Sequence, residues 1–374
     1  MHMIDGLGRG GAEHLLTIYA PELQRQGFDM RVVALKDWGE SPVAGRLRAA
    51  GIAVERLPLA KLRNIGQIRA AMKRLREIGP DVIHAHLEAS TVLAGLARIA
   101  LRVPVVSTLH TLEYPERFNR AGARLWLRDR LLANIFDRVI CLSPAIADEA
   151  RRHGLARAPV VSIANGIDLG AFDANRGKPP EEIRAGLGIP PAARVIVTVA
   201  VLRPPKGIDR LIRAMADLVP VQPDLHLLIV GEGEERARLE ALTAELGLDH
   251  AVTFAGFRSD VADVLRVAEL FVLPTLWDAL PTVLIEAMAA DLPIVASNVG
   301  GIPDMVRDGT DGILVPKDDV PALTGAIGAI MGDEAHRQEM ARAARERVEA
   351  EFSLPIQVGK LADLYRELSK DDGR

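Results

Sequence analysis

The chain has 374 residues, of which 49% are hydrophobic and 26% are charged, and this composition is typical of a folded globular protein with room for two domains. Its single cysteine, Cys141, excludes a disulfide framework within the chain and favours a reducing, cytoplasmic location. The sequence contains no apolar run long enough to span a bilayer and no secretory signal pattern, so we expect neither a membrane span nor export.

The formal net charge of −4 is unevenly distributed along the chain. Residues 1–174 contain 24 Lys and Arg against 18 Asp and Glu, whereas residues 175–374 contain 22 against 32. A basic first half and an acidic second half indicate two units with different partners. The small basic excess, without a basic motif, argues against nucleic acid as one of them.

The first half alternates between short apolar runs and amphipathic segments, which predicts a doubly wound parallel sheet. We expect strands at residues 1–5, 30–35, 53–57, 81–84, 105–109, 138–142 and 160–163. A glycine-rich run at residues 6–11 separates the first strand from a helix expected at residues 12–26. Glycines between a strand and a helix let the backbone approach a phosphate, so the amides of Gly10 and Gly11 are candidate phosphate ligands.

Histidines follow two of the predicted strands, at the edge where ligands of such sheets gather. His84 and His86 lie at one strand end, and His110 lies at another. Each could be a hydrogen-bonded structural residue, but two strand ends marked in the same way favour a ligand site.

Two basic amphipathic segments, at residues 61–76 and 117–136, stand out in the first half. Each is expected to be either a surface helix or a segment that rests on an anionic membrane. The second interpretation predicts a peripheral location at the inner membrane face.

The α/β pattern restarts after a linker expected at residues 171–191, which contains a short helix near residues 180–186. Arg203 and Lys206 follow a strand expected at residues 194–201, where they are either solvated charges or a clamp for a diphosphate. Gly231 follows the strand at residues 225–230, and Arg258 follows another. Further strands are expected at residues 270–273, 293–296 and 312–316, and further helices at residues 208–218, 320–331, 334–349 and 355–368.

The stretch at residues 277–290 is the most informative part of the sequence. It follows an apolar strand, and Pro281 suits the first position of a helix because proline has no N–H to leave unpaired there. Such a helix start attracts anions. Asp278 precedes it and Glu286 lies one to two turns inside, so a diphosphate at the helix start would lie between two carboxylates that can accept hydrogen bonds from sugar hydroxyls.

This stretch resembles the Glu-x7-Glu motif of the retaining glycosyltransferases of family 4, which have the GT-B fold. The glycine run at residues 6–11 and the run Asn-Gly-Ile-Asp at residues 165–168 also resemble family motifs, as do Lys206 and Gly207. The sequence departs from the family pattern at five positions: Ala200 replaces a Gly, Val201 an Arg, Asp278 a Glu, Ala279 a Gly, and Asp304 a Glu.

The resemblance implies two Rossmann-like domains that face each other across a cleft. The first, at residues 1–170, would hold the acceptor, and the second, at residues 192–352, would hold the nucleotide-sugar donor. A helix within residues 353–374 would pack back towards the first domain. The reaction would transfer a sugar from UDP- or GDP-sugar to a glycan or lipid-linked acceptor, with retention and without a cofactor. No Asp-x-Asp pair occurs, so we expect no required metal.

The resemblance also assigns roles to residues of this chain. The catalytic set is His110, Lys206 and Asp278, and His84 and His86 would line the acceptor side. The donor-binding set is Gly10, Gly11, Arg203, Lys206, Gly231, Arg258, Asp278, Leu280, Pro281, Thr282, Val283 and Glu286. Glu286 would bind the ribose, and Asp278 the donor sugar.

Two other functions stay open from the sequence. A nucleotide-sugar 2-epimerase shares the two-domain fold, and a catalytically inactive partner protein would be consistent with Val201 and Asp278. An NAD-dependent dehydrogenase is disfavoured, because the Gly-x-Gly-x-x-Gly register with a ribose-binding acid is missing.

Overall fold

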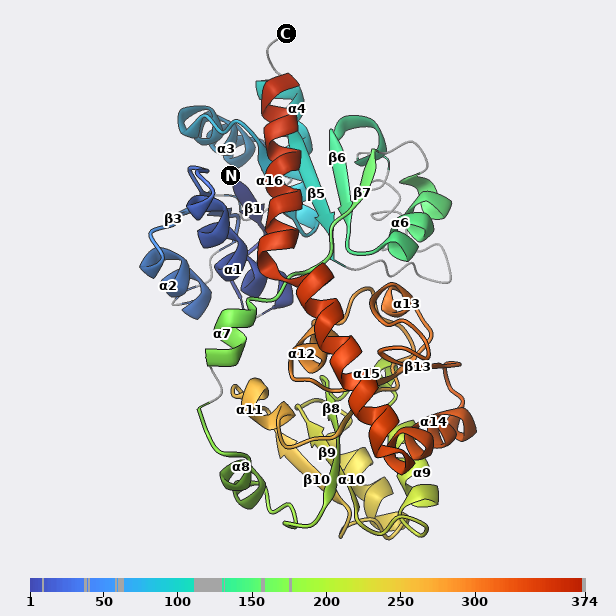
Figure 1. Ribbon diagram of the computed structural model, residues 1–374. Helices are drawn as coiled ribbons and strands as arrows, with labels where there is room; N and C mark the ends of the chain where they lie inside the picture. The colour runs from blue at the N-terminus through green and yellow to red at the C-terminus, as the bar shows by residue number, and fades with distance from the viewer. Residues whose placement is uncertain are drawn as a thin grey trace. The chain divides into compact units, whose positions relative to one another are not determined.

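The computed structural model describes residues 1–8, 10–36, 39, 41–57, 59, 64–110, 130, 132–155, 159–174 and 177–371. The chain forms two compact units (Figure 1). Unit 1 comprises Met1–Asn165 and Leu354–Arg374, and unit 2 comprises Gly166–Ser353. Each is an α/β unit built on a parallel sheet, which confirms the predicted fold class.

The sheet of unit 1 has seven parallel strands in the order β3-β2-β1-β4-β5-β6-β7. Their bounds are β1 (His2–Ile4), β2 (Arg31–Ala34), β3 (Ala53–Arg56), β4 (Ile83–His86), β5 (Val105–Leu109), β6 (Arg138–Cys141) and β7 (Val160–Ser162). The strand expected at residues 81–84 begins and ends two residues later, because the ladder with β1 and β5 runs through His86. His84 and His86 are therefore inside a strand and not in the loop after it.

The described helices of unit 1 surround this sheet. They are α1 (Gly11–Arg25), α2 (Pro42–Ala49), α3 (Ile65–Ile78), α4 (Glu88–Leu101), α6 (Pro144–Ala150), the π-helical turn η1 (Arg151–Leu155) and α16 (Leu354–Asp371). Val358, Leu361 and Tyr365 of α16 are buried in the same core cluster as Leu16 and Leu23 of α1. The last helix of the chain is thus part of the first unit.

The sheet of unit 2 has six parallel strands in the order β10-β9-β8-β11-β12-β13. Their bounds are β8 (Arg194–Val199), β9 (Leu225–Val230), β10 (Val252–Gly256), β11 (Leu270–Leu273), β12 (Ile294–Ser297) and β13 (Gly312–Val315). β9 and β11 are buried at every position, as parallel strands covered by helices on both faces should be.

The helices of unit 2 follow the strands in alternation. They are α7 (Leu169–Ala174), α8 (Pro180–Gly186), η2 (Pro204–Lys206), α9 (Ile208–Leu218), α10 (Arg236–Glu245), α11 (Val261–Leu265), α12 (Thr282–Ala289), α13 (Ile302–Met305), α14 (Val320–Gly332), α15 (Glu334–Arg347) and η3 (Val348–Phe352). The start of the expected linker is in fact helical, because α7 runs to Ala174 and the carboxylate of Asp168 accepts a hydrogen bond from the amide of Ala171 in its first turn.

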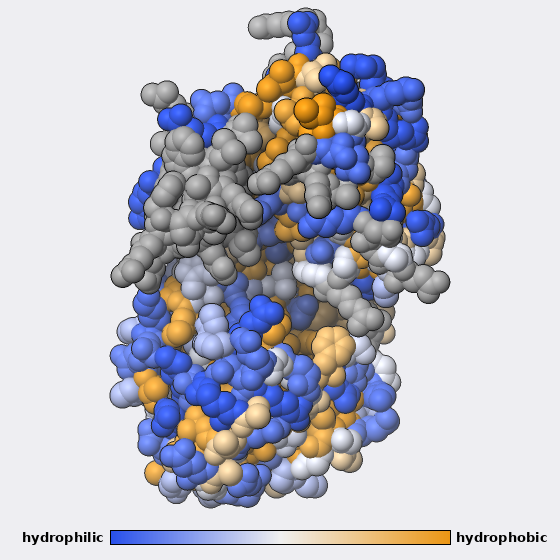
Figure 2. All heavy atoms as spheres, turned by 180° about the vertical axis from the view of Figure 1, so that it is seen from behind, coloured by the Kyte–Doolittle hydropathy of each residue, from blue (hydrophilic) through white to orange (hydrophobic). Residues whose placement is uncertain are grey.

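The exposed hydrophobic residues are scattered. On the face shown in Figure 2, hydrophobic residues lie mostly in small groups among hydrophilic ones. The most exposed large apolar side chains are Phe257, Val221, Ile99 and Ile65. Within the described part of the chain, no helix combines the length and the apolar character that a bilayer crossing requires.

We predict that Leu361→Ala loosens unit 1 selectively. Leu361 is 2% exposed in the core of that unit, and truncating a buried leucine costs about 2–5 kcal/mol. Hydrogen exchange measured by mass spectrometry should then speed up in β1 and β2 and stay unchanged in β8 and β9. Ile356→Ala is the matched control, because Ile356 lies on the same helix but is 37% exposed. Equal effects in both sheets would contradict the assignment of α16 to unit 1.

Candidate functional site

The sheet of unit 2 has a switch point between β8 and β11, where the strand order reverses. In open α/β sheets, ligands bind at such a point, beyond the carboxyl ends of the strands. The loop after β8 carries Arg203 and Lys206, and the loop after β11 carries Asp278. The topology therefore brings three predicted site residues to the place where a ligand is expected.

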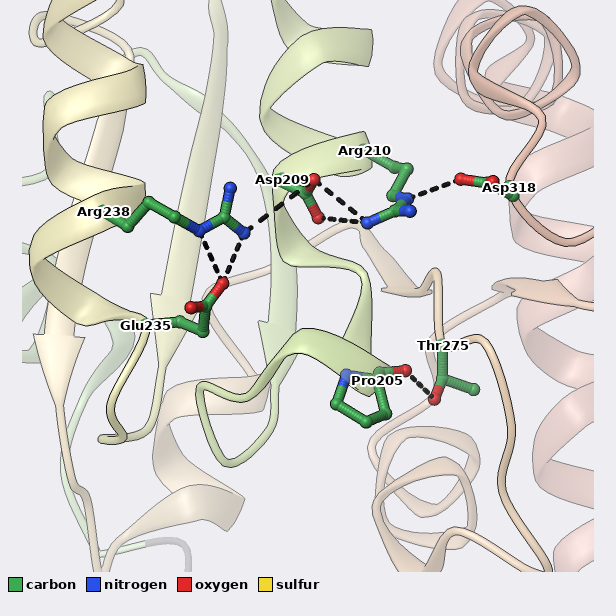
Figure 3. A network of polar contacts seen from close by, with 7 residues as sticks. All are labelled: Pro205, Asp209, Arg210, Glu235, Arg238, Thr275 and Asp318. Carbon is green, nitrogen blue, oxygen red and sulfur yellow. Dashed lines mark hydrogen bonds and ion pairs between the residues drawn. The ribbon is translucent and has the colours of Figure 1, made fainter. Parts of the chain in front are cut away.

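Two hydrogen bonds fasten these loops to each other. The carbonyl oxygen of Pro205 accepts one from the amide of Leu276 at 2.8 Å and one from Thr275 Oγ1 at 3.0 Å, the second of which is drawn in Figure 3. Both donors belong to the loop that leads to Asp278. The residue before Lys206 is thus anchored to the residues before Asp278.

Gly207 allows the two loops to come this close. It has φ +65°, and a Cβ at this position would overlap the carbonyl oxygen of Pro274. A side chain would therefore push the two loops apart, and glycine is required here for both reasons.

Lys206 and Asp278 form an ion pair as a result. Lys206 Nζ donates to Asp278 Oδ2 at 2.6 Å, and the two side chains are 28% and 17% exposed. The pair is reachable from solvent, so an incoming anion can share the ammonium group. The sequence predicted both residues for the site but not this contact, because they are 72 positions apart.

Two glycines after β12 support Asp278 from the other side. The amide of Gly301 donates to the carbonyl oxygen of Asp278 at 3.1 Å. Gly300, at φ +55°, passes so near that a Cβ would overlap the same oxygen. The backbone of Asp278 is therefore held in place before any ligand binds.

Helix α12 begins four residues after Asp278. Its first residue is Thr282 and not the predicted Pro281, because Pro281 has an extended ψ of 109° and occupies the cap position. No side chain caps this end, so the first amides, including those of Thr282 and Val283, are available to an anion. Leu280 is buried, and thus offers backbone groups rather than its side chain.

Glu286 lies inside α12 and is partly buried. Burial raises the pKa of its carboxyl from 4.5 to about 7. Near neutral pH this group is therefore divided between its charged and uncharged forms. An ionised Glu286 that accepts hydrogen bonds from ligand hydroxyls would lose part of this desolvation cost.

The remaining predicted residues of unit 2 lie on neighbouring loops. Gly231, at φ +135°, packs against the carbonyl of Ala200 so closely that no Cβ fits. The guanidinium group of Arg258 donates two hydrogen bonds to the carboxylate of Asp260, at 2.8 and 2.5 Å. A ligand would have to compete with Asp260 for this arginine. Arg203 is exposed. Val201 is 51% exposed, although its family counterpart is an arginine.

A charged network that the sequence did not reveal flanks the loop of Lys206 (Figure 3). Arg210 binds Asp209 and Asp318, and Arg238 binds Glu235 and lies 3.9 Å from Asp209. These contacts join the first turn of α9 to α10 and to the loop before α14. They stabilise the helix that follows Lys206.

In unit 1, Gly10 is the cap residue of α1 and Gly11 its first residue. No side-chain hydrogen bond caps this end. Glu13, in the first turn, lies so near that a Cβ on Gly10 would meet its carboxyl group. The predicted role of these two glycines as phosphate ligands stays a prediction.

The predicted histidines of unit 1 lie side by side, and two of them are buried. His84 is 2% and His86 is 6% exposed, and both ring nitrogens of each have partners. This arrangement is the structural role that the sequence left open. A buried imidazole with both nitrogens bonded has none left to contact an acceptor substrate. His110 is half-buried. Its Nε2 forms a hydrogen bond of 3.0 Å with Nδ1 of His86, and the tautomers decide which of the two nitrogens donates.

His2 and Tyr365 complete this cluster, and the sequence analysis missed both. His2 is paired with His84 across β1 and β4, and Tyr365 reaches the cluster from α16. A histidine in the first predicted strand was a usable signal for His2. No local pattern marks Tyr365, which is 281 positions from His84.

His2, His84 and His86 are also a candidate metal site, since one nitrogen of each lies within 4.8 Å of the others. Neutral imidazoles suit zinc and other late transition metals. In the structure, however, their nitrogens are bonded to one another and to neighbouring side chains.

The basic segments can be followed in part. Residues 61–63, 111–129 and 131 lie outside the described residues, so most of the second segment, at residues 117–136, lies outside them. In α3, Arg69, Lys73, Arg74 and Arg76 are exposed, and Arg74 binds Glu55 and Glu77.

Comparison with known proteins gives two family matches that together span most of the chain. A model described as Glycosyltransferase Family 4 matches residues 9–171, and one described as Glycosyl transferases group 1 matches residues 180–347. The D-inositol 3-phosphate glycosyltransferase of Saccharomonospora viridis is 29% identical over 96% of this chain and 89% of its own length. The alpha-D-kanosaminyltransferase of Streptomyces kanamyceticus is 31% identical over 79% of this chain and 80% of its own.

Solved structures show the same fold. Anabaena Alr3699/HepE in complex with UDP has a TM-score of 0.85 at 23% identity and covers 98% of this chain and 99% of that one. Sucrose-phosphate synthase from Thermosynechococcus elongatus has a TM-score of 0.81 at 26% identity and covers 99% of both chains. The two parallel-sheet units are thus those of the GT-B class of glycosyltransferases. Within that class, the chain belongs to glycosyltransferase family 4.

The raised pKa of Glu286 predicts a pH-dependent stability. The native state holds a proton on this group between pH 4.5 and about 7 while the unfolded chain has lost it, so native stability falls as the pH rises through this range. Glu286→Gln should remove the penalty. The variant should be more stable than the parent at pH 8, by up to about 3 kcal/mol, and similar to it at pH 4.5.

Urea unfolding at the two pH values measures this difference. Glu245→Gln, which removes an exposed carboxyl from α10, is the control for loss of charge alone. A Glu286→Gln effect of the same size at both pH values would show that the carboxyl is not protonated by burial.

Gly300→Ala should disturb the site more than a simple backbone strain would. A left-handed alanine costs about 1–2 kcal/mol by itself. Gly309→Ala is the matched control, because Gly309 has φ +73° but open space around its Cα. We expect Gly300→Ala to exceed the control in loss of stability and also to weaken nucleotide binding, measured by calorimetry. Equal losses for the two variants would mean that the contact with Asp278 is dispensable.

Proposed function

We propose that this glycosyltransferase moves a sugar from a nucleotide-diphosphate sugar to an acceptor hydroxyl, with retention at the anomeric carbon. The observation that carries the proposal is the pair of Lys206 and Asp278 at the switch point of unit 2, four residues before the uncapped start of α12. The neighbour structures that hold UDP or UDP-glucose support a nucleotide sugar as donor.

The charge that develops in the reaction explains these residues. When the bond from the anomeric carbon to the diphosphate breaks, negative charge collects on the diphosphate. Lys206 provides a positive charge, and the amides of Thr282 and Val283 provide fixed dipoles, so stabilisation needs little rearrangement. Asp278 then accepts hydrogen bonds from the donor sugar, and Glu286 accepts them from the ribose.

Retention requires that the acceptor reach the same face of the sugar from which the diphosphate leaves. In the mechanism that we propose, the acceptor oxygen bonds to the anomeric carbon as the diphosphate departs, and a diphosphate oxygen takes the acceptor's proton. No side-chain nucleophile is needed. In unit 1, the amides of Gly10 and Gly11 would bind phosphate, and His110 would bind the donor sugar.

We further propose that the reaction needs no metal ion. Lys206 supplies the charge that a divalent cation would otherwise contribute, and the sequence has no Asp-x-Asp pair. Transfer should therefore persist in EDTA.

The proposed acceptor is a polyhydroxyl compound, either a glycan or a lipid-linked sugar made at the inner membrane face. The basic first half and the exposed cations of α3 support an anionic acceptor or an anionic lipid surface. Flotation with vesicles that contain anionic lipid tests the membrane contact. Because relatives are named D-inositol 3-phosphate glycosyltransferases, that compound belongs in the acceptor panel.

A thermal-shift panel of UDP, GDP and ADP, followed by their sugars, tests the donor, since a ligand of the native state raises its melting temperature. The stabilising nucleotide sugar is then incubated with and without acceptors. Glycosylated acceptor supports transfer, whereas an epimerised sugar without acceptor supports a 2-epimerase. Failure of every nucleotide to bind would support an inactive partner protein.

We predict that Lys206→Ala lowers donor affinity or turnover on the order of tenfold to a hundredfold. The reason is loss of a charged hydrogen bond to the diphosphate, which contributes roughly 1.5–3 kcal/mol. Lys178→Ala is the control, because Lys178 is an exposed lysine of the same unit that is 3.9 Å from Glu182. Steady-state kinetics that are the same for both variants would remove Lys206 from the donor site.

A further inference from the structure

Six side chains of unit 1 form a single row joined by five hydrogen bonds. In order, they are His110, His86, His2, Tyr365, His84 and Thr108. The distances are 3.0 Å from His110 Nε2 to His86 Nδ1, 2.8 Å from His86 Nε2 to His2 Nδ1, 3.3 Å from His2 Nε2 to the Tyr365 hydroxyl, and 2.7 Å from His84 Nε2 to Thr108 Oγ1. The Tyr365 hydroxyl also bonds to His84 Nδ1.

The row stays uncharged at neutral pH. His2, His84 and His86 are 1%, 2% and 6% exposed, and their ring nitrogens are bonded to imidazoles and hydroxyls, so a charge in the row would be buried without a counter-ion. Burial raises the pKa of Tyr365, which therefore keeps its proton. Each imidazole thus has one N–H and one bare nitrogen.

This proton count leaves two arrangements for the whole row. A neutral ring that donates at one nitrogen must accept at the other, and the Tyr365 hydroxyl must donate to one neighbour and accept from the other. Every donor therefore points towards Thr108, or every donor points towards His110.

Thr108 distinguishes the two arrangements. If the donors point towards it, its own hydroxyl hydrogen needs another acceptor, and none is found among the described residues. Thr108 is 7% exposed, and a buried donor without a partner costs about 1–3 kcal/mol. If the donors point towards His110, Thr108 donates to His84, and every hydrogen before His110 has an acceptor.

We propose that Thr108, His84, Tyr365, His2 and His86 are positioning residues that fix His110 as the Nδ1–H tautomer, so that it offers a single donor to an oxygen of the bound sugar. The assignment of the sugar as ligand rests on the proposed function. The tautomer itself does not, and it can be measured without substrate.

Long-range ¹H–¹⁵N spectra of the full chain with ¹⁵N-labelled histidine test the proposal, because protonated and bare ring nitrogens differ in chemical shift. We expect His2, His84, His86 and His110 all to be neutral with the proton on Nδ1. The exposed His250 and His336 provide an internal reference. A proton on Nε2 of His110, or a charged ring at pH 7.5, would overturn the proposal.

Tyr365→Phe cuts the row in the middle and keeps the ring. We expect His110 to become a mixture of tautomers and sugar transfer to slow by about three- to tenfold, the effect of one neutral hydrogen bond. Tyr19→Phe is the matched control, because the Tyr19 hydroxyl bonds to the carbonyl of Ala164 and is not part of the row. If the tautomer of His110 is unchanged in Tyr365→Phe, the row does not set it.

Thr108→Val and Thr108→Ser provide a second test if Tyr365→Phe folds poorly. The valine has the same shape without a hydroxyl and should release the tautomer of His110, whereas serine keeps the hydroxyl and should preserve it. If the tautomer of His110 is fixed in the parent protein but the rate of transfer is unchanged in Tyr365→Phe, the positioning role is overturned. Absence of any nucleotide binding would instead count against the proposed function, and the spectra would still decide the tautomer.

The alternative to a hydrogen-bonded row is a metal ion bound by the histidines, and metal analysis of the same samples tests it. A cavity of about 30 Å³ lies beside the histidines, which is room for one small species. Metal bound in equal amount to the protein, together with spectra that change when a chelator removes it, would overturn the hydrogen-bonded row.

Discussion

The position of one carbonyl group, that of Pro205, sets the geometry of the candidate site in unit 2. It receives two hydrogen bonds from the loop after β11, and so it holds Lys206 against Asp278 across the switch point of the sheet. Glycine at position 207 makes this approach sterically feasible, and glycine at position 300 lets the loop after β12 pack against the carbonyl of Asp278. The charged groups are thereby fixed by backbone contacts, which are less sensitive to salt and pH than the ion pair itself.

The two units accommodate the polar side chains near their sheets in different ways. Unit 2 keeps opposite charges at the rim, where water still reaches them and a phosphate can compete for the lysine. Unit 1 buries the rings of His2, His84 and His86 and gives each of their nitrogens a hydrogen-bond partner. In the interior, unpaired charge is expensive, whereas a fully satisfied row of neutral groups is well tolerated. The first arrangement suits an anionic ligand, and the second suits a group whose orientation must not vary.

Much of the fold could be predicted from the sequence, because strands such as β9 and β11 are short apolar runs bounded by turn residues. The approximate position of Lys206 and Asp278 also followed, since both come directly after such strands. Their contact did not follow, because it depends on how two loops far apart in the chain meet. The partners of His84 were equally hidden. Tyr365 looks like one more apolar residue of an amphipathic helix until its hydroxyl is placed in three dimensions.

The division of unit 1 between the two ends of the chain has a consequence for biosynthesis. All of unit 2 leaves the ribosome before α16, so it has the opportunity to fold while the first sheet still lacks its last helix. A polypeptide released before residue 354 would contain the complete second unit and every histidine of the row but not Tyr365. A prematurely terminated product would thus keep the complete sheet of unit 2 with Lys206 and Asp278, but its histidine row would lack the hydroxyl that joins His2 to His84.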